Sequence, residues 1–160
     1  KRQAYEGAKA LANGEVTRAH YARYLVQIGK VSNDGQAFKR YLGSGKSCFV
    51  KAEWVDIPTA IDTIHAAGGV AVIAHPMRYN MTGKWIRRLI VDFKQWGGDG
   101  MEVADSGQTK DQRQYLARLA NEYDLAASLG SDFHFPCGWI ELGKNLFLPE
   151  EVKPIWTLFE

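Results

Sequence analysis

Two side chains that can bind a metal or a phosphate stand two residues apart late in the chain. Asp132 and His134 follow a small apolar run that ends at Gly130. Because residues i and i+2 of an extended segment point to the same side, the carboxylate and the imidazole should project together. The pair alone fits two interpretations: a metal or phosphate site, or an aspartate that caps a turn beside an ordinary polar histidine.

A second histidine occupies a comparable place. His75 directly follows the apolar run 70–74, Glu102 lies within the run 101–104, and Asp105 comes just after it. His75 alone is more typical of a turn, but strand ends of a parallel sheet meet at one rim, and two of them here carry histidine. Metal ligation is therefore the better interpretation. A site of imidazole nitrogen and carboxylate oxygen atoms suits zinc, manganese or iron.

Two arginines are candidates for binding a phosphate. Arg78 comes three residues after His75, in a loop expected above the same rim, where a guanidinium beside a metal can clamp a phosphate. Arg18 opens a helix predicted from Thr17 to Gly29, where free backbone N–H groups also face an anion. The alternatives are a solvated loop arginine and an exposed helix arginine.

The order of predicted elements divides the chain in two. Residues 1–45 read as three short helices, and residues 46–160 read as an alternation of strands and helices. The alternating part comprises a helix from 57, strands at 70–74, 101–104, 126–129 and 146–148, helices at 82–96 and 110–123, and a last helix from 149. This order predicts right-handed βαβ units, hence an α/β fold with parallel strands that place their functional residues at the strand carboxyl ends.

Composition sets broad limits. The 160 residues are 46% hydrophobic, which is enough for one sizeable core, and the net charge of +2 neither indicates nor excludes a nucleic-acid partner. No apolar run reaches membrane-span length and no signal peptide is visible at the start. Cys48 and Cys137 form neither a close-spaced ligand pair nor a disulfide framework. We therefore expect a cytoplasmic setting.

Three strings of residues carry a family resemblance. They are Ala74-His75-Pro76 with the following Arg78-Tyr79, Gly130-Ser131-Asp132-Phe133-His134, and Thr17-Arg18-x-His20-x-Ala22-Arg23. The first two resemble the C-terminal half of the PHP (polymerase and histidinol phosphatase) metal-dependent phosphoesterases. The third is similar to the helical insertion of the subfamily of 3′,5′-nucleoside bisphosphate phosphatases and 5′-to-3′ exoribonucleases.

The resemblance implies a fold, a site and a chemistry. The fold is the C-terminal part of a distorted (β/α)7 barrel, with residues 1–45 as the helical insertion. The implied metal ligands are His75, Asp132 and His134, with Asp132 and His134 catalytic through a metal-activated water, and Arg18 and Arg78 contact substrate phosphates. The implied cofactor is two or three Mn²⁺ ions, with iron or zinc as alternatives. The implied substrates are nucleotide phosphates and short RNA 5′ ends.

One departure from the family is serious. The family barrel begins with a His-x-His strand, and this sequence has only four histidines and no such motif. We therefore expect the chain to be the C-terminal portion of the enzyme, inactive alone, with the N-terminal half of the barrel as its partner. An exposed sheet edge would also favour a homodimer. The alternatives are a phosphatase of histidinol phosphate or another small phosphomonoester, and a non-catalytic interaction module.

Overall fold

The computed structural model describes residues 2–134, 138 and 140–159, so Cys137 lies outside the described residues. The chain divides into two compact units, Lys1–Trp54 and Val55–Glu160. The sequence placed this boundary earlier, between residues 45 and 46. The two units are called the helical unit and the α/β unit below, and each is described by itself.

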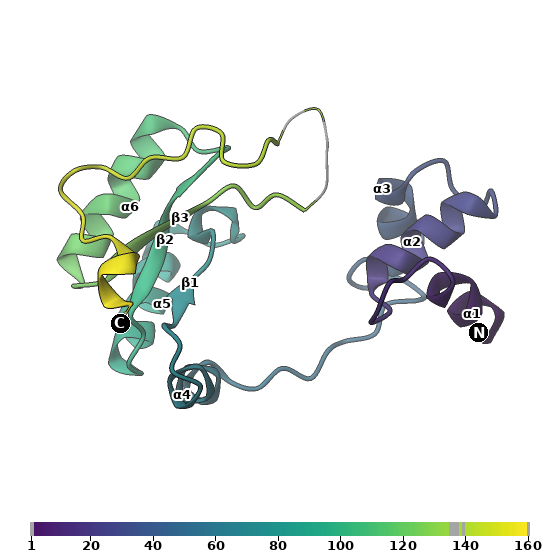
Figure 1. Cartoon of the computed structure of the whole chain (residues 1–160), viewed down its shortest axis with the longest axis horizontal. Coiled ribbons are helices and arrows are strands. Elements are labelled where there is room, and N and C mark those ends of the chain that lie inside the picture. The colour runs from purple at the N-terminus through teal and green to yellow at the C-terminus, as the bar shows by residue number, and fades with distance from the viewer. Residues whose placement is uncertain (1, 135–137, 139, 160) are drawn as a thin grey trace. The chain divides into compact units, whose positions relative to one another are not determined.

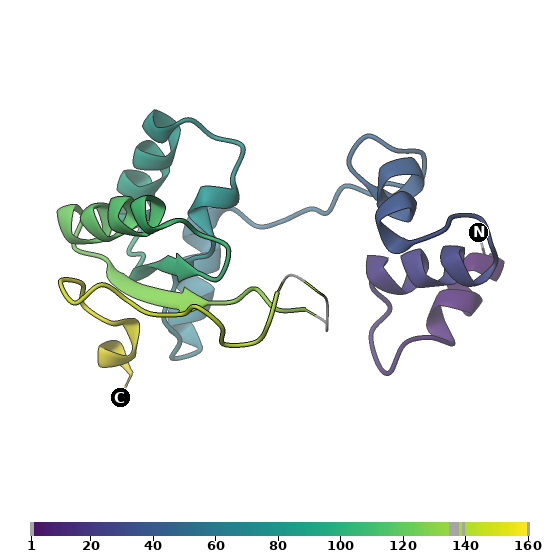
Figure 2. The same ribbon diagram turned by 90° about the horizontal axis from the view of Figure 1, so that it is seen from above.

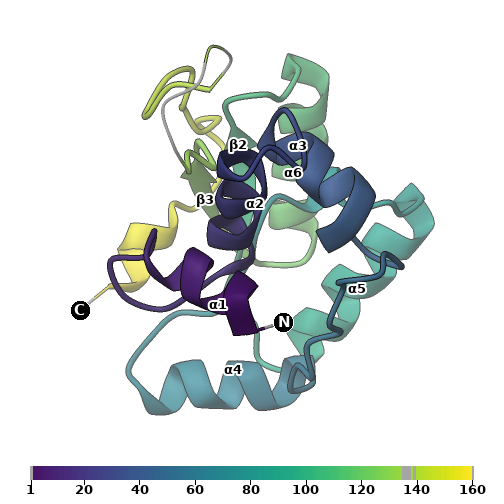
Figure 3. The ribbon, with the colours of Figure 1, turned by 90° about the vertical axis from the view of Figure 1, so that its right-hand side faces the viewer.

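The helical unit contains three α-helices and one π-helical turn: α1 (Arg2–Lys9), α2 (Arg18–Gln27), α3 (Asp34–Ala37) and η1 (Phe38–Leu42). Helix α2 lies between α1 and α3 (Figure 3). Its start is fixed by Thr17, whose backbone N–H donates to Nδ1 of His20 at 3.0 Å. Small side chains allow the helices to approach one another, and the core consists of Ala22, Val31, Ala37 and Leu42.

The α/β unit alternates helices and strands as the sequence predicted. Its main elements are α4 (Ile57–Ala66), β1 (Val72–Ile73), α5 (Gly83–Gln95), β2 (Gly100–Asp105), α6 (Lys110–Glu122) and β3 (Ala126–Gly130) (Figure 1). The strands form one parallel sheet in the order β1-β2-β3. Helices α5 and α6 lie on one face of this sheet (Figure 2), as right-handed crossovers require. The predicted α/β fold class, with parallel strands preceded by a helical segment, is confirmed.

Local signals and burial explain these elements. Asp56 begins α4 by accepting the Thr59 N–H at 2.9 Å, and Thr109 and Gln112 form a reciprocal cap at the start of α6. Every residue of β2 is buried, as expected for the central strand of a parallel sheet. The core between sheet and helices includes Ile61, Ile90, Met101, Val103, Leu116 and Leu119. None of the helices in the described part of the chain is long and apolar enough to cross a membrane.

Two predictions for the C-terminal segment were wrong. Residues 146–148 do not form a strand, and the helix predicted from Pro149 is only a 3₁₀ turn, η3 (Ile155–Leu158). The reason is Pro154, which lacks an N–H and would interrupt a helix that began at 149. The chain instead passes beside β3, where the Ala127 N–H donates to the Lys153 carbonyl at 2.7 Å and Ala127 forms a parallel bridge with Pro154.

Candidate functional site

The predicted site residues of the α/β unit lie just beyond the carboxyl ends of the strands. His75 follows β1 by two residues and Asp132 follows β3 by two residues. Both have left-handed backbones, with φ of 34° at His75 and 54° at Asp132. Such conformations are unfavourable for residues other than glycine and cluster at functional sites. Asp124 and Asn145 share this kind of backbone, so the conformation agrees with a functional role for His75 and Asp132 but does not single them out.

Glu102 of β2 connects the flanking strand ends. Its side chain is buried, and its Oε2 accepts the His75 backbone N–H at 2.6 Å. Its Oε1 lies against Gly130, where a Cβ atom would stand only 2.5 Å away. Burial raises the pKa of Glu102, and the hydrogen bond from His75 offsets only part of this shift. Glu102 thus holds the His75 loop, and its carboxylate occupies the space that a side chain at Gly130 would fill.

Arg78 joins two carboxylates that come from different strand ends. It lies in the 3₁₀ turn η2 (Pro76–Arg78), and its Nε donates to Asp105 Oδ2 at 2.9 Å while its Nη1 donates to Asp132 Oδ2. The hydrogen bond to Asp105 is the main cause of the raised pKa of Arg78. The Arg78 side chain is 37% exposed and Asp105 only 4% exposed, so part of the arginine side chain faces solvent. The arrangement holds one accessible cation over two acids.

The loop after β2 fixes Asp105. Asp105 Oδ1 accepts the Gly107 N–H at 2.6 Å, and its own N–H donates to Gln108 Oε1 at 3.1 Å. Ser106 Oγ donates to the Ser131 carbonyl at 3.2 Å and so connects this loop to the one that carries Asp132. The sequence placed Asp105 at the rim, but it gave no sign that Ser106 and Gln108 would support it.

The two histidines have the chemistry that a metal ion requires. Nδ1 of His75 is buried and has no hydrogen-bond partner among the described residues. Nδ1 of His134 lies 2.8 Å from the Asp132 carbonyl, which can only accept, so in the neutral imidazole this nitrogen carries the proton and Nε2 has the lone pair. Imidazole nitrogens and carboxylate oxygens are donor types that suit a divalent cation of the zinc or manganese type.

The predicted residues are only partly brought together. Arg78 contacts Asp132 directly, and His134 Nδ1 lies 3.7 Å from Asp132 Oδ1. Arg18 is the first residue of α2, in the helical unit. In the part of the chain that the structure describes, no three histidine, cysteine, aspartate or glutamate side chains form a group that could hold a metal ion. The ligand set and the role of Arg18 remain predictions.

Sequence reasoning missed Arg113. This arginine of α6 is 5% exposed, its Nη2 donates to the Asn145 carbonyl at 3.1 Å and to the Asp105 carbonyl at 3.4 Å, and its guanidinium stands 3.9 Å from the Phe147 ring centroid. Burial lowers its pKa. A signal was present, because position 113 falls on the apolar stripe of α6 with Leu116 and Ala117. Arg113 ties the C-terminal segment to the Asp105 loop.

We expect Arg113→Met to destabilise the chain by about 1–2 kcal/mol, since two carbonyl partners lose a charged donor while the cost of burying a charge is relieved. Urea unfolding measures this difference. Arg118→Met is the matched control, because Arg118 is exposed on the same helix and should change stability by less than about 0.5 kcal/mol. Equal stabilities of the two variants would show that Arg113 does not tie the segment down.

The chain is similar to curated exoribonucleases and to a curated nucleoside bisphosphate phosphatase. It is 81% identical over 156 residues to a 5′-3′ exoribonuclease of Haemophilus influenzae, covering 98% of this chain and 57% of that protein. It is 51% identical over 158 residues to the 5′-3′ exoribonuclease Rnm of Escherichia coli, covering 98% of the chain and 54% of that protein. It is 42% identical over 146 residues to a 3′,5′-nucleoside bisphosphate phosphatase of Chromobacterium violaceum, covering 91% of this chain and 51% of that protein.

Two solved structures are also similar to this chain. An amidohydrolase from Chromobacterium violaceum with bound sulfate and no metal matches 96% of this chain and 54% of its own, with TM-score 0.81 and 39% identity. A protein described as a metal-dependent phosphoesterase from Bifidobacterium adolescentis matches the same shares with TM-score 0.68 and 26% identity. No protein-family model matches the chain. The chain spans about half the length of the curated relatives it matches, and the relationship predicted from its sequence is confirmed.

Proposed function

We propose that this chain works within a longer enzyme that hydrolyses phosphate esters of nucleotides. The proposal starts from its similarity to about half the length of each exoribonuclease and of the bisphosphate phosphatase. This longer protein, called the full-length enzyme below, would contain the N-terminal barrel half as well. Its proposed substrates are 3′,5′-nucleoside bisphosphates and the 5′ ends of short RNA, and its proposed location is the cytoplasm. The observation that carries the proposal is the cation Arg78, held by Asp105 and Asp132 at the rim beside His75 and His134.

Each side chain at this rim has a proposed role. His75, Asp132 and His134 would hold the divalent cation, proposed to be manganese, together with residues of the other barrel half. When bound, such a cation lowers the pKa of a coordinated water toward neutrality and neutralises phosphate charge. The partly exposed Arg78 would bind phosphate oxygens through its guanidinium, and Asp105 keeps it oriented. Asp132 accepts a proton from the attacking water.

The test is phosphate release by the full-length enzyme from a 3′,5′-nucleoside bisphosphate, a 5′-phosphorylated RNA trimer and histidinol phosphate. We expect release from the first two, loss after treatment with EDTA, and recovery on adding Mn²⁺. Hydrolysis of histidinol phosphate alone would assign the enzyme to small phosphomonoesters instead. Absence of hydrolysis in all three would contradict the proposal and favour a non-catalytic module.

A further inference from the structure

The charges of the chain are divided unequally between its two units. Residues 1–54 carry ten lysines and arginines against four aspartates and glutamates, a formal charge of +6. Residues 55–160 carry ten against fourteen, a formal charge of −4. The overall charge of +2 hides this division. A strongly basic unit attached to an acidic one indicates an anionic partner for the basic unit.

The cations of the helical unit are available to a partner. Every ion pair described in the structure joins residues of the α/β unit. In contrast, all nine described basic residues of the helical unit are exposed and take part in none of these pairs: Arg2, Lys9, Arg18, Arg23, Lys30, Lys39, Arg40, Lys46 and Lys51. Since their neighbours do not neutralise them, these side chains keep their full attraction for a polyanion.

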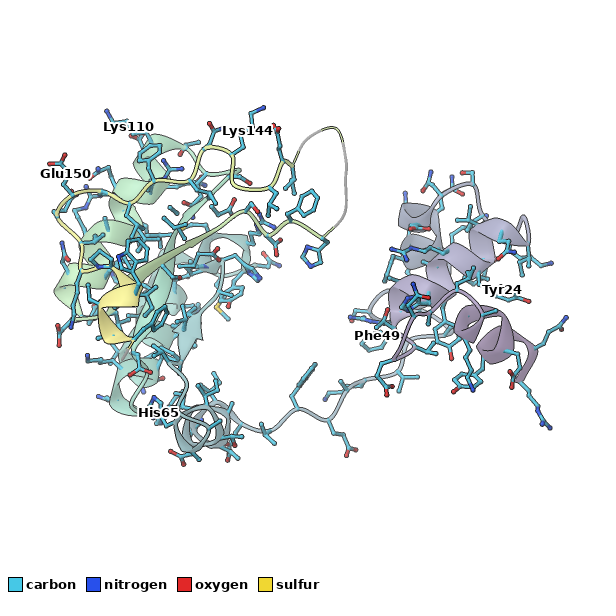
Figure 4. The ribbon with its side chains drawn as sticks, viewed as in Figure 1. Tyr24, Phe49, His65, Lys110, Lys144 and Glu150 are labelled. Carbon is cyan, nitrogen blue, oxygen red and sulfur yellow. The ribbon has the colours of Figure 1, made fainter. Side chains whose placement is uncertain are left out.

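Aromatic rings accompany two of these cations. The Arg40 guanidinium lies 5.8 Å from the Tyr41 ring centroid, and the Lys9 ammonium lies 6.0 Å from the centroid of the exposed Tyr5 ring. Cations beside aromatic rings are the combination by which proteins hold single-stranded nucleic acid, through phosphate contacts and base stacking. In Figure 4 the labels Tyr24 and Phe49 mark the helical unit, and polar side chains project from its helices.

The segment 39–46 concentrates these features. Lys39, Arg40 and Tyr41 lie in the π-helical turn η1, which the Gly43 N–H closes by donating to the Phe38 carbonyl at 2.8 Å. π-Helical turns are rare in proteins as a whole, and those that do occur are often found at functional sites. The loop that carries Lys46 returns to this turn, where the Cys48 N–H donates to the Tyr41 carbonyl at 3.0 Å. Three exposed cations thus lie on one local structure, and the Tyr41 ring beside them packs partly against the core of the unit.

We propose that the helical unit binds the sugar-phosphate backbone of single-stranded RNA, with the segment 39–46 as a principal contact. This rests on the proposed function and extends it, because nine exposed cations far exceed what the two phosphates of a bisphosphate can engage. RNA is favoured over a membrane surface. A helix that lies in a membrane turns an apolar stripe to the lipid, whereas the apolar residues of α2, Tyr21, Leu25 and Val26, pack against the core of the unit.

The experiment measures binding of a fluorescein-labelled 20-nucleotide single-stranded RNA to the 160-residue chain by fluorescence anisotropy over a range of salt concentrations. The test variant is Lys39→Glu with Arg40→Glu, and the matched control is Arg118→Glu with Lys153→Glu, which changes the same charge at exposed, unpaired positions of the α/β unit. We expect the test variant to bind at least about tenfold more weakly. The slope of the logarithm of its binding constant against the logarithm of the salt concentration should become shallower by about 0.7 for each RNA phosphate that the variant no longer neutralises. The control should bind as the unmodified chain does.

A second variant and two control measurements distinguish loss of RNA binding from loss of folding and from membrane binding. Lys39→Gln with Arg40→Gln should give a smaller loss in the same direction, and circular dichroism should show unchanged helix content in both variants. Equal losses in test and control variants, or binding to phosphatidylserine vesicles without binding to RNA, would overturn the proposal. Hydrolysis of a bisphosphate by the full-length enzyme is assayed separately, so failure of RNA binding and failure of the proposed function are told apart.

Discussion

Replacing Asp132 with alanine should abolish phosphate release by the full-length enzyme, with a loss of at least about 10³-fold, the upper range for removing one preorganised electrostatic group. Two effects combine. The proposed cation loses a carboxylate ligand, and Arg78 loses one of the two acids that hold its guanidinium. The measurement is the initial rate of phosphate release from a 3′,5′-nucleoside bisphosphate at saturating Mn²⁺.

Two further variants separate chemistry from folding. Asp132→Asn preserves the shape of the side chain and should lose nearly as much activity, because its amide is a poor ligand and carries no charge. Asp62→Ala removes an exposed acid of α4 and should leave the rate unchanged. The assignment of Asp132 is wrong if Asp132→Asn retains the rate of the unmodified enzyme.

Gly130→Ala should destabilise the chain by about 2–3 kcal/mol, near the upper range for overpacking a filled site. The added methyl would stand 2.5 Å from Oε1 of Glu102, a buried carboxylate that also accepts the His75 N–H. Glu102 must therefore shift, and the hydrogen bond that fixes the His75 loop is lost with it. Urea unfolding gives the change in stability, and phosphate release by the same variant of the full-length enzyme should fall as well.

Gly83→Ala is the matched control for this substitution. Gly83 begins α5, where a Cβ atom would meet only the Tyr115 hydroxyl at 3.5 Å, an ordinary contact. Alanine there should be neutral or stabilise the chain by up to about 1 kcal/mol, because alanine favours helices. Equal stabilities of Gly130→Ala and the unmodified chain would show that Glu102 moves freely and does not position His75.

The fold was predictable where periodicity and end signals agreed. The helices α5 and α6 have apolar stripes and begin after a threonine, and strand β1 lies within the continuous apolar run 70–74. The C-terminal segment was mispredicted because its apolar spacing suits a helix while Pro154 prevents one. Its actual place beside β3 depends on a backbone hydrogen bond from Ala127, which no side-chain pattern reveals.

The places of the candidate site residues at the strand ends were predictable, and the connections between them were not. His75, Asp132 and His134 stand at strand ends in sequence, so parallel topology alone brings them to one rim. The pairing of Arg78 with both Asp105 and Asp132 depends on the path of the η2 turn, and the buried Arg113 looks like a surface residue until the stripe of α6 is considered. The metal and phosphate chemistry inferred from the residue types stays a prediction, and tertiary packing determined which groups meet.

The binding of a divalent metal by His75, Asp132 and His134 in the full-length enzyme is the step on which the proposed chemistry depends. Its most direct test is the metal content of the purified protein by inductively coupled plasma mass spectrometry, for the unmodified enzyme and for His75→Ala, Asp132→Ala and His134→Ala. His65→Ala is the control, since His65 lies on α4 and bonds Asp99 at 2.7 Å. We predict bound metal in the unmodified enzyme and the control, and a clear loss in all three test variants. Full metal content in those three would contradict the account.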